Sequence, residues 1–494
     1  MSRRTLGPPK PGRLLENLHI ESVDLEGQGV AHFEGKVVFV AGALTGERLD
    51  AHVLRERPSY IKAQMATLRR ESSDRRQPAC SHYGVCGGCS MQHATDTAQL
   101  AYKQRVLEDN LWHLGRIKAF ERLAPLRGPA FGYRARARLS ARWVDKKGGL
   151  LLGFRERAGR YVTAMDHCPV LRPEASAILP ALKDCLQSLS VARHIPQVEI
   201  AVSDDGFTVW VIRVMQSPSD QDLKSLHAFE RSHASALQIW LQPKGPETAA
   251  PLRSFLTESL LASMEVDAEL FASHLHTCRE LDELQEHKAP AARRNNEPAL
   301  WLSLPEFGLR MPFSPVDFTQ VNFAINRRLV YKAIQLLDVQ PEDRVVDFFC
   351  GLGNFSFALA GKAFEVLGFE GSHALVAKAR ANAKLLQLAH KTSFQVSNLF
   401  EVNRAWLDDL GRVDCALVDP PREGAQALSE ALAEQSFEGR GPRRFVMVSC
   451  NPATLARDAA ILVHKGRWQL RKAGVANMFA QTAHVESLAV FDRC

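Results

Sequence analysis

A cysteine at the end of an apolar segment is the first residue in this sequence that could do chemistry. Residues 444–449 are rich in β-formers, and Cys450 follows them directly, before a turn at Asn451 and Pro452. Open α/β sheets keep their reactive side chains at the carboxyl ends of parallel strands. A cysteine in this position is more often an inert core residue. Three other segments favour a nucleophile instead: residues 347–354, 418–422 and 484–487.

Residues 347–354 have the composition of a nucleotide-binding loop that follows a strand. Glycines let the backbone approach a ligand closely, and Glu370, at the end of the next strand, can accept hydrogen bonds from ribose hydroxyls. The loop fits dinucleotide enzymes as well as methyltransferases. It lacks the full G-x-G-x-x-G pattern that cradles a pyrophosphate. Because S-adenosylmethionine has no phosphate, we expect that ligand.

A rigid polar turn closes the fourth strand of the same region. It comprises Asp419, Pro420, Pro421 and Arg422. Two prolines restrict the backbone, so the aspartate and the backbone carbonyls are held without a moving loop. Such a turn suits gripping the edge of a planar heterocycle. A simple strand-ending turn is the alternative.

Cys450 and Glu486 together match the chemistry of uracil methylation at C5. That carbon is too weak a nucleophile to take a methyl group directly. Addition of a thiolate to C6 produces an enolate that is nucleophilic at C5, and a base must then remove the C5 proton so that the thiol can leave. The target base must be flipped out of any stack. We therefore predict Cys450 as the nucleophile and Glu486 as the base.

Four of the ten cysteines have the spacing of metal ligands. They are Cys80, Cys86, Cys89 and Cys168. Four thiolates suit either an iron–sulfur cluster or structural zinc. Three ligands from one loop and one distant ligand differ from the paired knuckles of most zinc sites, which favours a cluster. Zinc stays possible because three histidines accompany the cysteines: His82, His93 and His167.

Composition indicates a globular protein that is compatible with a nucleic-acid partner. The chain has 494 residues, of which 46% are hydrophobic and 24% charged, so we expect two to four domains. No apolar run reaches the ~20 residues of a membrane span, and the first residues lack the apolar segment of a signal peptide. We expect a cytoplasmic protein without a disulfide framework or a membrane association.

Positive charge is gathered on one predicted strand. The net charge is +7, and Arg134, Arg136 and Arg138 alternate with alanines, so they would project from one face of a strand. An RNA-binding face and a merely solvated basic face both account for this pattern.

The order of predicted elements indicates an α/β fold with additional modules. From about residue 330, helices alternate with strands at 345–349, 364–370, 393–396, 414–419 and 445–449, which predicts a doubly wound, Rossmann-like parallel sheet. Residues 14–68 read as short strands broken by glycine turns, as in small β-barrels of the oligonucleotide-binding type. A barrel that serves only as an adaptor is the alternative.

Between these two parts the pattern is mixed. A helix is predicted over 99–120, and the apolar run 209–214 predicts a central strand in a mixed α+β region. Residues 280–298 are polar and charged, which indicates a surface insertion. The charged linker at 69–77 predicts that the N-terminal module makes few packing contacts with the rest of the chain.

These motifs resemble those of the RNA uracil-5-methyltransferase family. The resemblance rests on residues 318–322, 347–354, 419–422, 449–458 and 484–487, and residues 27–31 with 45–47 resemble a TRAM domain. It covers nearly the whole chain and is weakest between about 182 and 304. The chain is most similar to members that act on 23S ribosomal RNA, since relatives that act on transfer RNA lack both the TRAM domain and the cluster.

The resemblance implies roles for particular residues. The implied S-adenosylmethionine contacts are Gln320, Phe349, Asn354, Glu370, Asn398 and Asp419, with Ser397 as an alternative to Asn398. It implies a [4Fe-4S] cluster on Cys80, Cys86, Cys89 and Cys168 that supports the fold and RNA binding. It also implies Cys450 as nucleophile and Glu486 as base. We expect a monomer that binds 23S ribosomal RNA and needs no protein partner.

The resemblance also implies a layout of domains. A flexible basic tail is expected at 1–13, and a TRAM-like, RNA-binding β-barrel at 14–72. Residues 73–92 and 125–310 are expected to form a central domain with the iron–sulfur site. Residues 93–124 and 311–494 are expected to form the S-adenosylmethionine-dependent methyltransferase domain.

Three other functions compete with this interpretation. One is a uracil methyltransferase that acts on a different ribosomal site or on transfer RNA. Another is a radical enzyme that cleaves S-adenosylmethionine at a cluster with an open iron site, against which Cys168 as a fourth ligand argues. The third is an RNA-binding or assembly protein without catalysis, in which Cys450 and Glu486 would matter only for binding.

Overall fold

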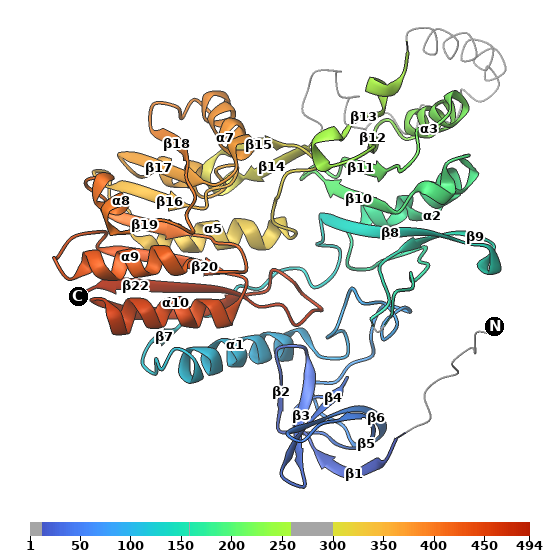
Figure 1. Cartoon of the computed structure of the whole chain (residues 1–494), viewed down its shortest axis with the longest axis horizontal. Coiled ribbons are helices and arrows are strands. Elements are labelled where there is room, and N and C mark those ends of the chain that lie inside the picture. Colours follow the sequence, from blue (N-terminus) through green and yellow to red (C-terminus); the bar gives the residue numbers. More distant parts are fainter. Residues whose placement is uncertain (1–11, 158, 258–299) are drawn as a thin grey trace.

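The computed structural model describes residues 12–157, 159–257 and 300–494. Most of the expected basic tail and the whole of the expected insertion at 280–298 lie outside the described residues. The described chain forms an N-terminal sheet, a central sheet with an adjoining hairpin, and a C-terminal sheet with helices (Figure 1). Within those residues, no helix is both long and apolar enough to cross a bilayer.

The N-terminal sheet has six strands in the order β1-β5-β6-β4-β3-β2 and curls into a half-barrel. The strands are β1 (Leu14–His19), β2 (Ser22–Val23), β3 (Gln28–Phe33), β4 (Lys36–Ala41), β5 (Arg48–Glu56) and β6 (Tyr60–Arg70). Alternate residues such as Val38, Val40, Ile61 and Ala63 point into its core. The prediction of a small N-terminal β-barrel module is confirmed, in the form of an open half-barrel.

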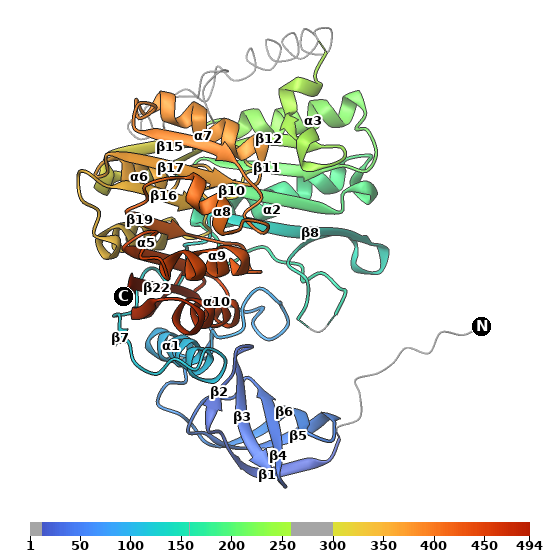
Figure 2. The same ribbon diagram turned by 60° about the vertical axis from the view of Figure 1, so that its left-hand side comes forward.

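This module meets the rest of the chain through the loop between β4 and β5. Leu44 packs on Ala94 and Ala98 at the start of helix α1 (Asp96–His113). Glu47, which is fully buried, accepts two hydrogen bonds from the linker residue Arg75, at 2.6 and 2.8 Å. The half-barrel therefore lies against α1, as both ribbon views show (Figure 2). One arginine of the charged linker is thus paired inside the interface, and the expectation of few packing contacts stays a prediction.

The central sheet is mixed, in the order β13-β12-β11-β10-β8-β9. Its strands are β8 (Arg136–Val144), β9 (Gly149–Gly153), β10 (Gln197–Val202), β11 (Thr208–Arg213), β12 (Leu237–Gln242) and β13 (Ala250–Pro251). Helices α2 (Pro173–Ser188) and α3 (Asp220–Ser232) accompany it, and β14 (Leu300–Leu304) and β15 (Leu309–Phe313) form a hairpin. As predicted, the apolar run near 209 lies in an interior strand, where Trp210 is fully buried.

Short 3₁₀ turns complete this middle part. They span Asp145–Lys147, Ala192–His194, Pro246–Thr248, Leu252–Phe255 and Pro305–Phe307.

The C-terminal sheet has eight strands in the order β18-β17-β16-β19-β20-β22-β21-β7. They are β16 (Arg344–Phe348), β17 (Glu365–Glu370), β18 (Thr392–Val396), β19 (Cys415–Val418), β20 (Arg444–Ser449), β21 (Trp468–Ala476), β22 (Glu486–Arg493) and β7 (Glu121–Arg122). The five strands from β18 to β20 are parallel, and β22 runs antiparallel to β20 and β21. The predicted Rossmann-like sheet is confirmed.

Helices accompany the C-terminal sheet along the chain. They are α5 (Phe323–Leu337), α6 (Ser356–Ala360), α7 (His373–Leu385), α8 (Arg404–Asp409), α9 (Gln426–Ser436) and α10 (Pro452–Lys465). Helix α1 contacts α10 and β21, and β7 pairs with β21, so residues before the central sheet join this C-terminal unit. The helix predicted over 99–120 begins at Asp96, because Thr95 caps it through the Ala98 amide. It ends at His113, shortly before Arg116, whose φ is 54°.

The strand order reverses beside β16. The chain passes from β16 outward to β17 and β18, and then returns to β19 on the other side of β16. Loops after β16 and β19 therefore diverge and leave a crevice at the carboxyl ends of these strands, which is where ligands of open α/β sheets bind.

Candidate active site

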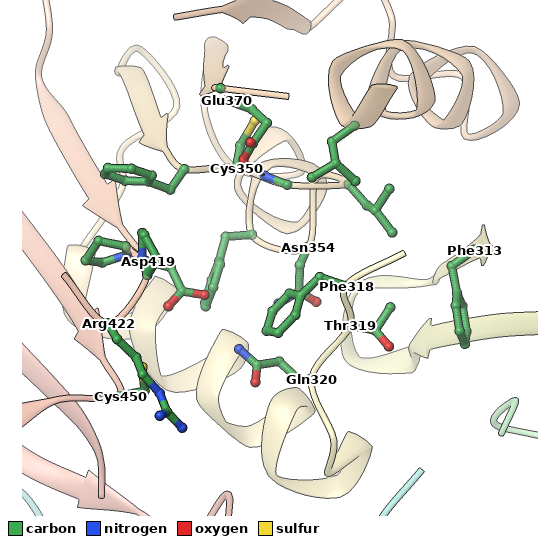
Figure 3. Close-up of a pocket in the computed structure, with 18 of the residues that line it drawn as sticks. Phe313, Phe318, Thr319, Gln320, Cys350, Asn354, Glu370, Asp419, Arg422 and Cys450 are labelled. Atoms are coloured by element: carbon green, nitrogen blue, oxygen red, sulfur yellow. Dashed lines mark hydrogen bonds between the residues drawn. The ribbon is translucent and has the colours of Figure 1, made fainter. Parts of the chain in front are cut away.

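A cavity of about 640 Å³ opens at the carboxyl ends of the parallel strands. All eight residues that were predicted as cofactor-binding or catalytic line it: Gln320, Phe349, Asn354, Glu370, Asn398, Asp419, Cys450 and Glu486. Figure 3 shows Gln320, Asn354 and Asp419 around the same space, with Cys450 at its edge. Asn398 is part of the lining and Ser397 is not, which favours Asn398 of the two alternatives.

The loop after β16 has a strained backbone that only part of its sequence explains. Phe349 is not a glycine yet has a φ of 62°, a conformation that functional loops often retain. Gly353 has a φ of 95°, and a Cβ there would lie 2.3 Å from the Phe357 ring. The Gly351 amide donates to the Glu370 carboxylate at 3.2 Å. The acid of the second strand is thus held against the glycine loop.

Asn354 is oriented by a residue that the sequence analysis did not identify. Its side-chain amide exchanges two hydrogen bonds with that of Asn326, at 2.9 and 3.0 Å. Asn326 lies on α5 and is fully buried, so the pair has one arrangement. In the sequence, Asn326 is marked only by its position one helical turn after Asn322, which belongs to the motif at 318–322.

Negative charge is concentrated beneath the cavity. Asp347, at the end of β16, is fully buried and accepts a hydrogen bond from the Ser356 hydroxyl. Burial raises the pKa of Asp347 to about 7, because it disfavours the charged carboxylate. Loss of solvation likewise raises the pKa of Asp419 to about 7. A cation bound here would favour the ionised forms of both carboxyl groups.

Cys450 and Glu486 come together through antiparallel pairing. Cys450 follows β20, Glu486 begins β22, and the register pairs Ser449 with Ser487, which places the two residues side by side at the cavity. Burial and then the charge of Asp419 raise the pKa of Glu486 well above its ordinary value. Burial and then the charge of Glu486 raise the pKa of the Cys450 thiol to about 11. Both shifts favour the protonated forms of these groups in the free protein.

Three further cavity residues received no role from the sequence alone. Arg422 faces Cys450, and its positive charge partly offsets the raised pKa of the thiol. Phe318 lines the cavity with 75% of its surface exposed, and His484 lines it two residues before Glu486. All three lie within motifs that had been noted, but a motif match does not say which of its side chains face the ligand.

The four predicted metal-ligand cysteines line a second, much smaller cavity of about 20 Å³. The fold thus brings Cys168 to the loop that carries Cys80, Cys86 and Cys89. Burial raises the pKa of Cys86 and Cys168, and that of Cys89 to about 11, so these thiols are protonated unless a metal displaces the protons. Among the described residues, no group of three or more His, Cys, Asp or Glu side chains forms a metal site. The cluster therefore stays a prediction.

A switch-point cavity, a glycine loop without the pyrophosphate pattern and acids beneath it define an S-adenosylmethionine-dependent methyltransferase. Residues 310–493 match the family described as tRNA (Uracil-5-)-methyltransferase, and residues 16–66 match the TRAM domain. The chain belongs to the RNA uracil-5-methyltransferase family, and within it to the RlmD group, because it is 46–48% identical to RlmD relatives over 96–97% of its length.

Individual relatives support this placement. The chain is 48% identical over 479 residues to the 23S rRNA (uracil(1939)-C(5))-methyltransferase RlmD of Bordetella bronchiseptica, with 97% of this chain and 93% of the relative covered. It is 47% identical to the RlmD of Cupriavidus pinatubonensis, with 96% and 95% covered. The fold is shared with the Pyrococcus abyssi tRNA (uracil-54, C5)-methyltransferase in complex with S-adenosyl-L-homocysteine, at a TM-score of 0.67 and 21% identity over 96% of this chain and 99% of that one.

Proposed function

We propose that this protein transfers a methyl group from S-adenosylmethionine to C5 of a uridine in 23S ribosomal RNA. The target named for its relatives is uracil 1939, and we propose the same nucleotide here. One observation carries the proposal: Cys450 and Glu486 line the same cavity as the glycine loop and its acids. A nucleophile and a base at one end of the methyl donor's site is the arrangement that C5 methylation needs.

The chain's own residues fit S-adenosylmethionine by charge and shape. Glu370, whose carboxylate accepts hydrogen bonds from the backbone amides of Gly351 and Ser372, would accept hydrogen bonds from ribose hydroxyls, and Phe349 lines the same cavity. Gln320, Asn354 and Asn398 supply amide groups at the cavity wall. The cofactor, when bound, supplies an electrophilic methyl group on a positively charged sulfur, which suits the acids beneath the cavity.

The thiol and the carboxylate act in sequence. Cys450 loses its proton to solvent, and its sulfur bonds to C6 while the electrons of the C5–C6 double bond move to O4. The enolate carbon C5 then bonds to the methyl carbon of S-adenosylmethionine as that carbon's bond to the sulfonium sulfur breaks, which leaves S-adenosyl-L-homocysteine. The Glu486 carboxylate then removes the C5 proton, the double bond re-forms, and the bond from C6 to sulfur breaks to release Cys450 as a thiolate. A carboxylate whose pKa is raised by burial is the stronger base for this step.

The RNA itself would lie across several modules. The TRAM half-barrel is one contact surface, and the exposed Arg138 on β8, which pairs with Glu199 at 3.0 Å, is another. Arg136 on the same strand instead donates to the carbonyls of Pro315 and Asp317. The target uridine would be flipped out to reach the cavity.

We further propose that Cys80, Cys86, Cys89 and Cys168 hold the [4Fe-4S] cluster, which would support the fold because methyl transfer needs no electrons. The four cysteines border one small cavity, although their thiols do not form a metal site in this structure, so ligation would need them to draw closer together.

Two substitutions should fail at different steps and so test the mechanism. Cys450→Ala should bind RNA and cofactor but form no covalent adduct, because the ring is never activated. Glu486→Gln keeps the side chain's shape but removes the base, so methylated RNA should accumulate on Cys450 and survive denaturing electrophoresis. An active Cys450→Ala protein, or a Glu486→Gln protein that turns over normally without an adduct, contradicts the mechanism.

The RNA substrate is tested separately. Mass spectrometry of 23S ribosomal RNA and transfer RNA from cells with and without this gene should show loss of one 5-methyluridine in the 23S RNA. Loss from transfer RNA instead would favour the competing substrate.

A further inference from the structure

The loop of residues 477–485, here called the base loop, joins β21 to β22 and ends directly before Glu486. It also supplies Phe479 and His484 to the cavity wall. Its position therefore affects both the proposed base and the surface that the uracil would meet. The base loop is not held by its own strands alone, because segments from the N-terminal third of the chain bind it. The linker residue Arg76 donates to the Gln481 side chain at 2.9 Å, and three further segments contribute.

The first of these segments is the cysteine loop, residues 80–91. The backbone amides of Ser90 and Met91 both donate to the Gln481 carbonyl, each at 3.0 Å. The Ala483 amide donates to the Ser90 hydroxyl at 3.0 Å. Ser90 directly follows Cys89, so the base loop is attached to the chain within one residue of a proposed cluster ligand.

The second segment is the strand-like stretch before β8. The Tyr133 hydroxyl donates to the Ala480 carbonyl at 2.8 Å, and Tyr133 is almost fully buried. It packs in the same core as Cys86 and Cys168. The surroundings of the cysteines thus reach the base loop by a second route.

The third segment is helix α1. Gln99 and Gln481, both fully buried, exchange two hydrogen bonds of 2.9 and 3.0 Å. The Gln99 amide also donates to the carbonyls of Met91 and Ala94. One turn further along, the buried Lys103 ammonium donates to the Asn477 side chain and the Phe479 carbonyl, each at 2.9 Å. Helix α1 therefore connects the cysteine loop to the base loop.

The backbone of the base loop has a conformation that needs this support. Gln481 has a φ of 65°, in the left-handed region that is unfavourable for a residue with a side chain. Buried polar groups in a network of this kind are costly when any partner is lost, so the network has one low-energy arrangement.

We infer that Gln99 and Gln481 are positioning residues that fix the base loop to the cysteine loop and thereby place Glu486 for removal of the C5 proton. The inference rests on the proposed role of Glu486. Proton transfer requires the carboxylate within about 2.6–3.2 Å of the proton's carbon or its bridging water. A displacement of about 1 Å costs on the order of 100-fold in rate. A change in the conformation of the cysteine loop would then alter the rate of the elimination step, in which Glu486 removes the C5 proton.

The test uses full-length protein, S-adenosylmethionine and unmodified 23S ribosomal RNA. Gln99→Leu keeps the side chain's volume and removes its hydrogen bonds. We expect it to lower kcat by roughly 10- to 100-fold, to leave cofactor affinity within about twofold, and to raise the steady-state fraction of RNA bound covalently to Cys450. Ser90→Ala and Tyr133→Phe each remove one bond and should shift that fraction in the same direction by a smaller amount.

Ser436→Ala is the matched control. Ser436 is fully buried on α9, and its hydroxyl accepts from the Arg467 amide at 2.8 Å, away from the base loop. It should lower the melting temperature without raising the adduct fraction. The inference is wrong if Gln99→Leu behaves as Ser436→Ala does, while Glu486→Gln still traps the adduct. If Gln99→Leu does not fold, an unchanged adduct fraction in both Ser90→Ala and Tyr133→Phe overturns it. Absence of the adduct in Glu486→Gln would instead overturn the proposed function.

Discussion

At the scale of single residues, the site is built from carboxyl groups whose ionisation the fold opposes. Asp347 is the clearest case, because it is fully buried and one of its oxygens lacks a hydrogen-bond partner within the described part of the chain. An acid in such surroundings is stable in its neutral form and costs stability when it ionises. A bound sulfonium would offset that cost.

Asp347→Asn should therefore change how stability depends on pH. Burial raises the pKa of Asp347 from 3.8 to about 7, so the folded state holds a proton that the unfolded state releases. The contribution of Asp347 to the free energy of unfolding should fall as pH rises from about 4 to 7 and then level off. Chemical denaturation of the cofactor-free protein should show that the free energy of unfolding of the variant rises relative to that of the parent between about pH 4 and 7, by on the order of a few kcal/mol. A constant difference from pH 4 to 8 would contradict this.

Residues at strand ends could be predicted from the sequence, whereas their supporting partners could not. Cys450 and Asp419 each follow an apolar strand, and this local pattern places them at the edge of the sheet. Asn326 and Gln481 have no such signal. Gln99 and Gln481 are 382 positions apart, and only the folded chain shows that their amides meet. Pairing across such distances depends on tertiary packing that no local pattern contains.

At the scale of elements, the direction of the last strands was the part of the fold that the pattern left open. An apolar run of β-formers predicts a buried strand, but parallel and antiparallel neighbours of that strand give similar patterns. The reversal at β22 matters for chemistry, because it brings the start of β22 to the same edge as the end of β20. Glu486 would lie at the opposite edge if β22 were parallel.

The attachment of the half-barrel to α1 should depend on the buried pair of Glu47 and Arg75. Glu47→Gln leaves the Arg75 guanidinium without a carboxylate, and we expect it to lower the free energy of unfolding by about 1–3 kcal/mol. It should also speed hydrogen exchange in residues 69–77. Glu56→Gln is the control, since the pair of Glu56 and Lys36 is partly exposed and exposed pairs contribute little to stability. Equal changes in the free energy of unfolding in the two variants would show that the buried pair stabilises the protein no more than the exposed pair does.

At the scale of the whole molecule, the cysteine cavity is lined by two segments, 80–92 and 165–170, with Arg134 and Phe154, and the end of the cysteine loop also meets the half-barrel and the base loop. The side-chain neighbours of Gly27, in the half-barrel, are Met91 of the cysteine loop and Ala483 of the base loop. Cys168 comes from the segment that leads into α2. A cluster bound there would cross-link segments that are distant in sequence, and its loss should loosen several of them together.

Metal analysis tests this arrangement. Protein purified without oxygen should be brown and contain about four irons per chain, and Cys89→Ser should lose iron and melt at a lower temperature. Cys185→Ser is a control because Cys185 lies on α2 outside the cavity. Its iron content should match that of the parent. Stoichiometric zinc without iron in the anaerobic protein would favour the zinc alternative.

The position of α1 in the chain also has a consequence for synthesis. Helix α1 is made early, but its buried Gln99 and Lys103 pair with groups near residue 480, which the ribosome adds 382 residues after Gln99. At about 5–20 residues per second, that interval is roughly 20–80 s. During it, the face of α1 that later meets α10 and β21 lacks those partners. The nascent chain therefore carries a partly uncovered helix until translation is nearly finished, and the catalytic cavity closes last.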